Sequence, residues 1–217
     1  IAGAEALVRW KKEPYGAVPP GLFIDWIEDN PCMYDLGNYV LAEALKNSAE
    51  FIKINPDFFI NVNVSAKQLK ENDYPPNHLC LEITERCRQL PIDVINEEVC
   101  FLQQYGIHFA MDDYGTGNAS SSIVLGVPMN EIKIDMSFIK GILNNEKQQM
   151  LVKNIVNFAR STNMKSCIEG VEDKSLQDYL RSFGATWFQG YYYSKPVGEE
   201  QLKKLLLEEM YNKKDAS

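Results

Sequence analysis

Histidine is scarce in this chain of 217 residues, and its cysteines are scattered. The two histidines are His78 and His108, and the five cysteines include no CxxC pair. Structural zinc sites are built from clustered cysteine and histidine ligands, so the sequence does not favour zinc. An odd number of dispersed cysteines is typical of free thiols in a reducing compartment rather than of a disulfide framework. The cysteines are Cys32, Cys80, Cys87, Cys100 and Cys167.

The chain also lacks a net positive charge. The formal net charge is −8 and the isoelectric point is about 4.9. Proteins that grip duplex DNA or RNA usually carry a basic face, so we expect neither duplex nucleic acid as a partner nor direct membrane contact. A small phosphate ligand is still compatible with this composition, because a bound metal ion can supply the positive charge.

Long apolar runs and glycine-rich phosphate loops are missing as well. No stretch approaches the roughly 18 apolar residues of a membrane span, and neither a signal peptide nor a GxGxxG or Walker motif occurs. The chain begins at Ile1 almost inside a motif, as an excised domain would. We therefore expect a cytoplasmic location, either for the whole protein or for the cytoplasmic part of a larger membrane-anchored one.

The chain does contain one repeated pattern, a short apolar run that leads into an acidic or amide side chain. A polar group at the end of a buried strand costs roughly several kcal/mol unless it is paired. Several strands that end this way predict one shared pocket, and oxygen ligands favour Mg²⁺, Mn²⁺ or Ca²⁺. The runs lead into Asn61-Val62-Asn63, Glu82, Asp112-Asp113, Asp135, Glu169 and Gln189.

Strand-like runs alternate with helix-like stretches along the chain. This alternation predicts parallel strands with right-handed crossovers. Seven strands with polar residues at their carboxyl ends predict an α/β fold, a TIM-like (β/α)8 barrel that lacks its first strand. A doubly wound open sheet is the alternative, although its phosphate loop is missing. The strands are expected near 5–10, 58–64, 79–84, 107–112, 131–135, 165–169 and 186–190. The helices are expected over 35–49, 91–105, 147–163, 173–183 and 199–212.

The most specific pair of candidate ligands is Asp112-Asp113. Two adjacent carboxylates that leave a strand point in different directions, so one can bridge two metal ions while the other binds only the second. Paired ions suit phosphodiester hydrolysis because they clamp both the attacking and the leaving oxygen. The alternative is an Asp-rich turn that caps a helix, because Gly115-Thr116-Gly117 follows at once.

Two pairs of glutamates are spaced three residues apart, Glu82 with Glu85 and Glu169 with Glu172. Each pair either turns into the loop layer above the strands or forms a surface charge pair. About six carboxylates at strand ends outnumber the lysine and arginine that could neutralise them. A metal ion is therefore the natural counter-charge.

Two cationic side chains are candidates for the same pocket. Lys133 lies inside an apolar run, where a buried ammonium needs a carboxylate or phosphate partner. It either forms a structural ion pair with the acids or positions the attacking water. Arg9 shares strand parity with Glu5 and Leu7, so its guanidinium could fork onto a phosphate.

At these positions the chain resembles the EAL-domain cyclic di-GMP phosphodiesterases of bacterial signalling. The likeness runs through nearly the whole chain and keeps the order of the family's motifs. The matching segments are Glu5-Ala6-Leu7-Val8-Arg9-Trp10, Val62-Asn63-Val64-Ser65-Ala66-Lys67-Gln68, Leu81-Glu82-Ile83-Thr84-Glu85, Asp112-Asp113-Tyr114-Gly115-Thr116-Gly117, Lys133-Ile134-Asp135, Glu169-Gly170-Val171-Glu172 and Gln189-Gly190-Tyr191.

The resemblance implies a hydrolase that converts cyclic di-GMP to linear pGpG with two Mg²⁺ or Mn²⁺ ions per active site, and with Ca²⁺ as an inhibitor. It also implies a homodimer, and sensor or diguanylate cyclase domains outside this chain. Glu85 would anchor the loop 112–121. The metal ligands would be Glu5, Asn63, Glu82, Asp112, Asp113, Glu169 and Glu172. The catalytic residues would be Lys133, Glu169 and Asp113, and the substrate contacts would be Leu7, Arg9 and Gln189.

Three departures from the family pattern bear on this expectation. We expect one EAL-type domain over 1–217 that lacks the opening strand. We also expect that a helix between 70 and 75 is absent, because only thirteen residues separate Ser65 from Leu79. Asn118 follows the loop glycine where the family usually has an aromatic residue. These departures leave two alternatives open: a cyclic di-GMP receptor that no longer cuts, and a structural or partner-binding domain.

Overall fold

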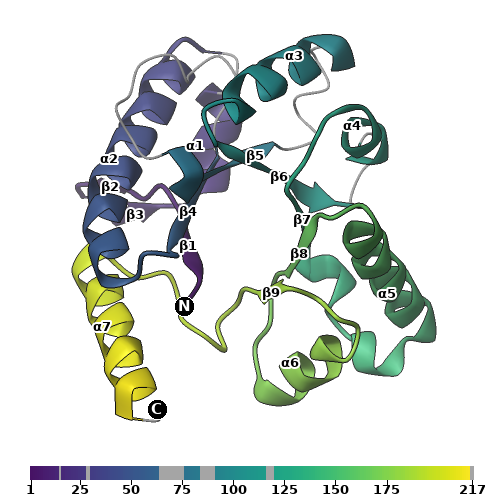
Figure 1. The fold of residues 1–217 in the computed structure, drawn as a ribbon. Helices are drawn as coiled ribbons and strands as arrows, with labels where there is room; N and C mark the ends of the chain where they lie inside the picture. The colour runs from purple at the N-terminus through teal and green to yellow at the C-terminus, as the bar shows by residue number, and fades with distance from the viewer. Residues whose placement is uncertain (15, 28–29, 64–75, 84–90, 116–119, 216–217) are drawn as a thin grey trace. The chain divides into compact units, whose positions relative to one another are not determined.

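A computed structural model describes the chain except for residues 15, 28–29, 64–75, 84–90, 116–119 and 216–217 (Figure 1). Its internal contacts divide the chain into two compact units. The first unit is formed by Ile1–Leu81 with Gly198–Ser217, and the second by Glu82–Val197.

Two parallel strands and a long helix form the centre of the first unit. β1 (Gly3–Ala6) pairs with β4 (Phe59–Asn63), and α2 (Cys32–Ile54) packs against β4. The ring of Phe51 on α2 meets Phe58 edge to face, with centroids 5.4 Å apart, and both side chains are buried. The other elements of this unit are β2 (Trp10–Lys12), β3 (Gly16–Val18), α1 (Pro20–Ile27), the 3-10 helix η2 (Pro76–His78) and α7 (Glu199–Asp215), which packs on α2.

The second unit alternates strands with helices. Its strands pair in parallel in the order β6 (His108–Tyr114), β7 (Glu131–Ile134), β8 (Lys165–Ile168) and β9 (Trp187–Phe188). β5 (Leu79–Ile83) crosses the boundary between the units, which falls after Leu81. The helices are α3 (Ile92–Gln103), α4 (Ser120–Gly126), α5 (Glu146–Ser161) and α6 (Lys174–Arg181), with the 3-10 helices η4 (Met136–Phe138) and η5 (Ile142–Asn144).

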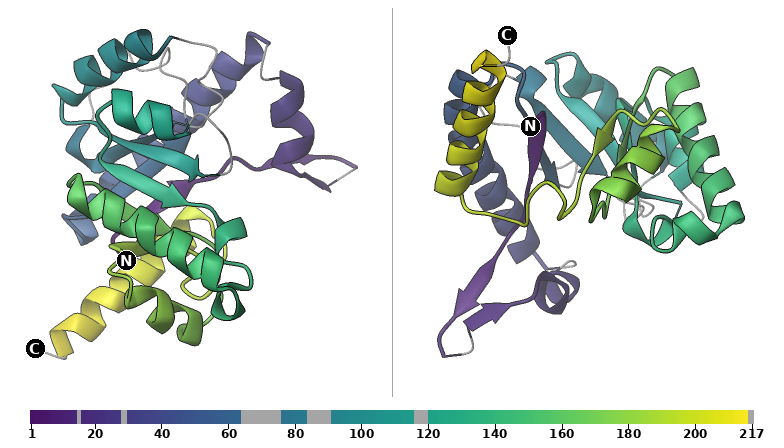
Figure 2. Two further views of the ribbon diagram at one scale, coloured as in Figure 1. Left: turned by 90° about the vertical axis from the view of Figure 1, so that its right-hand side faces the viewer. Right: turned by 90° about the horizontal axis from the view of Figure 1, so that it is seen from below.

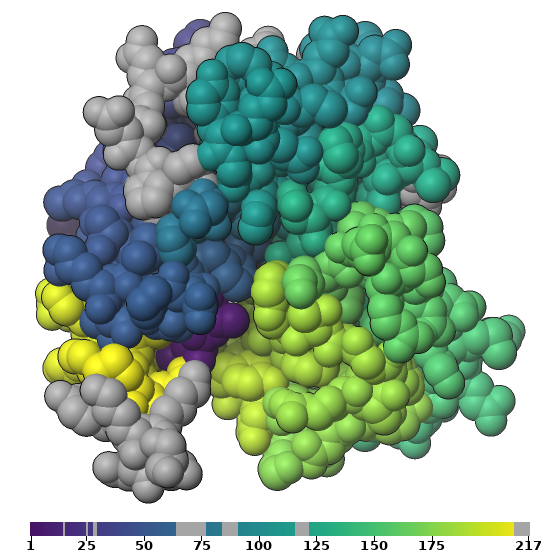
Figure 3. All heavy atoms as spheres, in the orientation of Figure 1, coloured from purple at the N-terminus to yellow at the C-terminus, as the bar shows by residue number. Residues whose placement is uncertain are grey.

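The helices of the second unit cover one side of its strands. α4 contacts β6, and α5 contacts both β7 and β8, as two further views show (Figure 2). Atoms of α3, α5 and α6, coloured from teal to light green, lie on the face of this unit that Figure 3 shows. The apolar stripe of α5 packs inward through Val152, Ile155 and Val156. This arrangement leaves the opposite face of the strands for the residues described below.

Side-chain caps fix where two of these helices begin. Asn145 accepts hydrogen bonds from the amides of Lys147 and Gln148 at the start of α5. Asp173 accepts from the amide of Leu176 at the start of α6. Such caps satisfy amides that have no partner within the helix.

The strand order confirms the predicted fold class. The strands are hydrogen-bonded in the order β1-β4-β5-β6-β7-β8-β9, which is their order in the chain once the separate β2-β3 hairpin is set aside. A doubly wound sheet would reverse direction within this order, so that alternative is wrong. The seven strands that the described residues contribute to this sheet are those of a TIM-like (β/α)8 fold, one fewer than its eight.

The structure differs from the sequence prediction in the first strand, the β2-β3 hairpin and two short helices. The predicted strand over 5–10 is wrong in extent, because β1 ends at Ala6 and Trp10 begins the antiparallel hairpin of β2 and β3. The helices α1 and α4 are only 8 and 7 residues long, too short for a clear helical period. Most of the segment 65–79, expected to be a shortened crossover, lies outside the described residues.

None of the helices in the described part of the chain is both long enough and apolar enough to cross a membrane.

Candidate functional site

Lys133 on β7 is the centre of the candidate site. Its Nζ lies 2.7 Å from Oε1 of Glu82, 2.9 Å from Oε1 of Glu169 and 3.2 Å from Oδ1 of Asp112. The Lys133 side chain is 1% exposed and that of Glu82 is 0% exposed. A lysine ammonium has three N–H donors, so these carboxylates match its full capacity. The structure thus brings together four of the residues that the sequence predicted for one pocket.

The backbone of β6 explains how two consecutive aspartates serve one site. Neighbouring side chains on a regular strand point to opposite faces. Here the register between β6 and β7 shifts between Met111 and Tyr114, and Asp113 has a φ of 50°. Positive φ is uncommon for residues other than glycine and is tolerated best by Asn and Asp. Local strain of this kind is characteristic of functional sites.

The result is a compact group of carboxylates. One ligand oxygen each from Asp112, Asp113 and Glu169 lies within 4.8 Å of the other two. All three side chains are half-buried, so solvent and ions can reach them. Three hard oxygen donors in this space fit a divalent cation such as Mg²⁺, Mn²⁺ or Ca²⁺.

The turn after β8 holds Glu169 by its backbone. The amide of Glu169 donates to the carbonyl of Ile134 at 3.1 Å. Gly170 follows with a φ of +72°, and a Cβ there would lie 2.5 Å from Cβ of Met136. Only glycine fits this turn, so the sequence Glu169-Gly170 is needed to send the chain past Met136 while the carboxylate stays at the strand end.

The two remaining predicted residues near this turn lie differently. The Gln189 amide donates to the carbonyl of Ile168 at 2.8 Å, and its carbonyl accepts from Val171 at 3.0 Å, so its backbone is tied to the same turn. Glu172 is exposed and does not belong to the group of Asp112, Asp113 and Glu169. Its role as a metal ligand stays a prediction.

In the first unit the structure pairs two further predicted ligands. Nδ2 of Asn63 donates to Oε1 of Glu5 at 3.1 Å across the neighbouring strands β4 and β1. Leu7 is 44% exposed, and Arg9 is exposed and donates to the carbonyl of Val8 at 2.8 Å. These positions are compatible with contact to a ligand, and the substrate roles of both residues stay predictions.

The loop-anchor role of Glu85 and the substitution at Asn118 both lie outside the described residues, as does the helix expected to be absent between 70 and 75. Asp112 and Asp113 are the described part of the loop 112–121 that bears on the site.

Sequence reasoning missed a sixth ionisable side chain, Glu131, which lies on the same strand as Lys133. It lies on the same face of β7 as Lys133, and it is 3% exposed. Burial raises the pKa of Glu131 to about 7, while the charge of Lys133 and a hydrogen bond with Cys167 act against this rise. The two-residue spacing from Lys133 indicates the shared face of the strand, but it does not indicate that the acid is buried.

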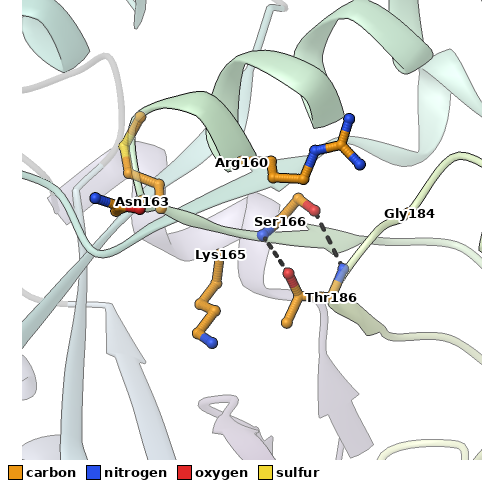
Figure 4. Close-up of a pocket in the computed structure, with 7 residues that line it drawn as sticks. Arg160, Asn163, Lys165, Ser166, Gly184 and Thr186 are labelled. Carbon is orange, nitrogen blue, oxygen red and sulfur yellow. Dashed lines mark hydrogen bonds between the residues drawn. The ribbon is translucent and has the colours of Figure 1, made fainter.

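A second concave region lies at the opposite end of β8. Seven residues line a cavity of about 250 Å³, namely Arg160, Asn163, Met164, Lys165, Ser166, Gly184 and Thr186 (Figure 4). The amide of Ser166 donates to Oγ1 of Thr186, and the amide of Thr186 donates to Oγ of Ser166, so the two residues fasten β8 to the following strand. None of the lining residues is a carboxylate. The cavity therefore lacks the carboxylates that would balance the charge of a divalent cation, and the acidic cluster is the candidate site.

Comparisons with known proteins agree with this geometry. A family model described as EAL domain matches residues 1–196. The bifunctional diguanylate cyclase/cyclic di-GMP phosphodiesterase MucR of Pseudomonas aeruginosa is 32% identical over 219 residues, which cover 93% of this chain and 32% of MucR. The oxygen sensor protein DosP of Escherichia coli is 31% identical over 216 residues, which cover 93% of this chain and 27% of DosP. The chain therefore spans about a third of the length of these curated relatives.

Solved structures give the same result. The PaMucR phosphodiesterase in complex with c-di-GMP matches with a TM-score of 0.82 and 30% identity, over 91% of this chain and 86% of that one. An EAL domain protein from Listeria monocytogenes EGD-e matches with a TM-score of 0.81 and 28% identity, over 92% of this chain and 83% of that one. The chain belongs to the EAL domain family.

Proposed function

We propose that this chain hydrolyses cyclic di-GMP to linear pGpG with two Mg²⁺ or Mn²⁺ ions. The observation that carries the proposal is the convergence of Asp112, Asp113 and Glu169 within 4.8 Å, next to a buried lysine. Membership of the EAL domain family and the c-di-GMP bound to the similar PaMucR structure support the choice of substrate.

The donor set fits divalent ions by both chemistry and charge. Glu82, Asp112 and Glu169 surround the single ammonium of Lys133, which leaves an excess of negative charge when all three are ionised. We propose these three and Asp113 as ligands, with Glu5, Asn63 and Glu172 completing the set. When bound, the ions would polarise the phosphodiester and favour the hydroxide form of a water molecule.

Other side chains would position the reactants. Lys133 can orient a water through its N–H groups once the ions engage its carboxylate partners. Glu169, at the carboxyl end of β8, can accept the proton of that water as a general base. Leu7, Arg9 and Gln189 are proposed to contact the dinucleotide, with the exposed guanidinium of Arg9 on a phosphate.

Turnover of cyclic di-GMP by the purified chain tests this function. The reaction is followed by chromatography in Mn²⁺, Mg²⁺, Ca²⁺ or EDTA. We expect pGpG with Mn²⁺ or Mg²⁺ and none with Ca²⁺ or EDTA. Binding without any pGpG in saturating Mn²⁺ would instead establish the second candidate, a catalytically silent cyclic di-GMP receptor.

We further propose a location, an oligomeric state and accompanying domains for this chain. We propose one EAL-type domain over 1–217, acting in the cytoplasm as a homodimer. Because the chain spans about a third of MucR and less of DosP, we propose that sensor or diguanylate cyclase domains accompany it in a longer protein. Sedimentation of the purified chain would test the dimer.

A further inference from the structure

Glu131 is a buried acid that the proposed mechanism does not use. It is the first residue of β7, and strand alternation places it on the same face as Lys133, one step nearer the amino end. The register partners of Glu131 are Ala110 on β6, which carries no charge, and Lys165 on β8, an exposed lysine whose Nζ lies 5.9 Å from the centre of the Trp187 ring. On β8, Cys167 pairs with Lys133 and shares its face with Glu169. Glu131 therefore lies directly behind the acidic cluster.

Burial is the main cause that opposes the ionisation of Glu131 in the protein without metal, and it raises the pKa of this carboxyl group. Lys133 on its own strand favours the anion, but this ammonium already faces three carboxylates. Glu169 on β8 and Asp112 on β6 disfavour it, and Cys167 on β8 contributes a hydrogen bond. A carboxyl group that is 3% exposed gains little from water. At neutral pH the group is thus divided between its acid and its anion, with a pKa of about 7.

We propose that Glu131 is a positioning residue that holds a proton in the metal-free protein and releases it to solvent when divalent ions bind to Asp112, Asp113 and Glu169. The O–H bond of the carboxyl group breaks, the proton passes to water or buffer, and the carboxylate stays behind Lys133. This inference rests on the proposed metal site.

The driving force is the reversal of charge in front of Glu131. Two divalent ions add four positive charges next to carboxylates that one ammonium had neutralised only in part. An opposite charge favours the ionised form of a nearby acid, and ion binding is then coupled to proton release. The ionised carboxylate of Glu131 would then balance the charge of the Lys133 ammonium, while the ions bind the carboxylates that Lys133 had contacted. Glu131 would act through Lys133 and would not touch the substrate.

Calorimetric titration of the full chain with Ca²⁺, without substrate, tests the coupling. Titrations at pH 6 and at pH 8, each in two buffers of different ionisation enthalpy, give the number of protons released on ion binding. With a metal-free pKa of about 7, we expect Glu131 to release roughly 0.9 proton at pH 6 and roughly 0.1 proton at pH 8. The apparent Ca²⁺ affinity should rise about tenfold over this range from this group alone.

The variant Glu131→Gln keeps the size and the hydrogen-bonding capacity of the side chain but has no proton to release. It should lose the extra proton at pH 6 and the tenfold rise in affinity. Glu97→Gln, an exposed substitution on α3 in the same unit, should behave like the wild type. If Glu131→Gln does not fold, the proton count of the wild type still decides.

The possible results separate the role of Glu131 from the hydrolase function. Ca²⁺ binding at pH 6 without proton release, or with equal release in Glu131→Gln, would overturn the role of Glu131 and leave the hydrolase proposal standing. Binding with the expected release, but with no pGpG formed in Mn²⁺, would support the role and favour the receptor. Absence of any ion binding would overturn both.

Discussion

Gly190 lies against the backbone of Val171 so closely that a Cβ on Gly190 would be 2.2 Å from the carbonyl oxygen and 2.4 Å from the amide nitrogen of Val171. The carbonyl of Val171 in turn accepts from the amide of Tyr192 at 3.0 Å. The chain after β9 thus packs backbone to backbone on the turn that follows Glu169.

Gly190→Ala should therefore destabilise the protein strongly. Neither neighbouring atom is the end of a flexible side chain, so the two segments must separate. We expect a loss of about 3 kcal/mol or more in the free energy of unfolding, measured with denaturant. The matched control is Gly21→Ala in α1, where nothing lies within 4 Å and alanine is the better helix former. Equal stability of the two variants would contradict the close approach.

Substitutions at Asp113 should separate backbone strain from metal binding. Asn tolerates the φ of 50° at this position, whereas Ala adds about 1 kcal/mol of strain. We expect Asp113→Asn to keep wild-type stability, Asp113→Ala to lose about 1 kcal/mol, and both to lose at least about 10–100-fold in Mn²⁺ affinity. Unfolding and Mn²⁺ titration measure the two effects. Wild-type affinity in Asp113→Asn would remove Asp113 from the ligand set.

Lys133→Met should leave three carboxylates facing one another without a cation. Removing one partner of a buried ion pair costs about 3–5 kcal/mol, because the remaining charges are uncompensated. We expect this loss of stability in EDTA and a partial recovery in millimolar Ca²⁺. Thermal unfolding under both conditions measures the two effects. Lys153→Met on α5 is the control for the loss of a lysine whose side chain is exposed. A variant that is equally unstable with and without Ca²⁺ would argue against ion binding by these acids.

The ionisation of Glu131 should lower the stability of the metal-free protein as the pH rises. Its pKa is about 7 when folded, above the ordinary value of 4.5, so the folded state binds more protons than the unfolded state between these pH values. Stability contributed by this group is therefore present below about pH 4.5 and lost as the pH rises through 7. The total loss is about 3 kcal/mol.

Glu131→Gln should remove this dependence in EDTA. We expect the variant to approach or exceed the wild type at pH 8, with its relative advantage growing by about 3 kcal/mol from pH 4.5 to pH 8. Denaturant unfolding across this range gives the difference curve. A flat difference would show that Glu131 ionises as an ordinary surface acid.

The sequence predicted those residues of the candidate site that lie at the ends of strands. Glu82, Asp112 and Glu169 follow apolar runs, and parallel strands bring their carboxyl ends to one edge. The conformation of Asp113 was harder to predict, because it depends on a register shift between β6 and β7 and on a positive φ. Nothing in a strand pattern specifies such a local departure.

Glu131 shows a second limit of sequence reasoning. An acid at the start of a strand is usually exposed, and only the packing of β6 and β8 on either side makes this one buried. Its pKa depends first on this burial, then on the charge of Lys133, and also on Glu169 and Asp112, which are distant in the sequence. The short elements α1, α4 and the β2-β3 hairpin were missed because a few residues cannot display a period.

The ammonium of Lys133 has a consequence for the order of events in the life of the protein. Since it already bridges Glu82, Asp112 and Glu169, the acidic cluster holds a resident cation before any ion arrives. Binding of the proposed divalent ions would then be a later exchange of one cation's contacts for another's. Their affinity would reflect a difference between two cations, set partly by how readily Lys133 yields its partners.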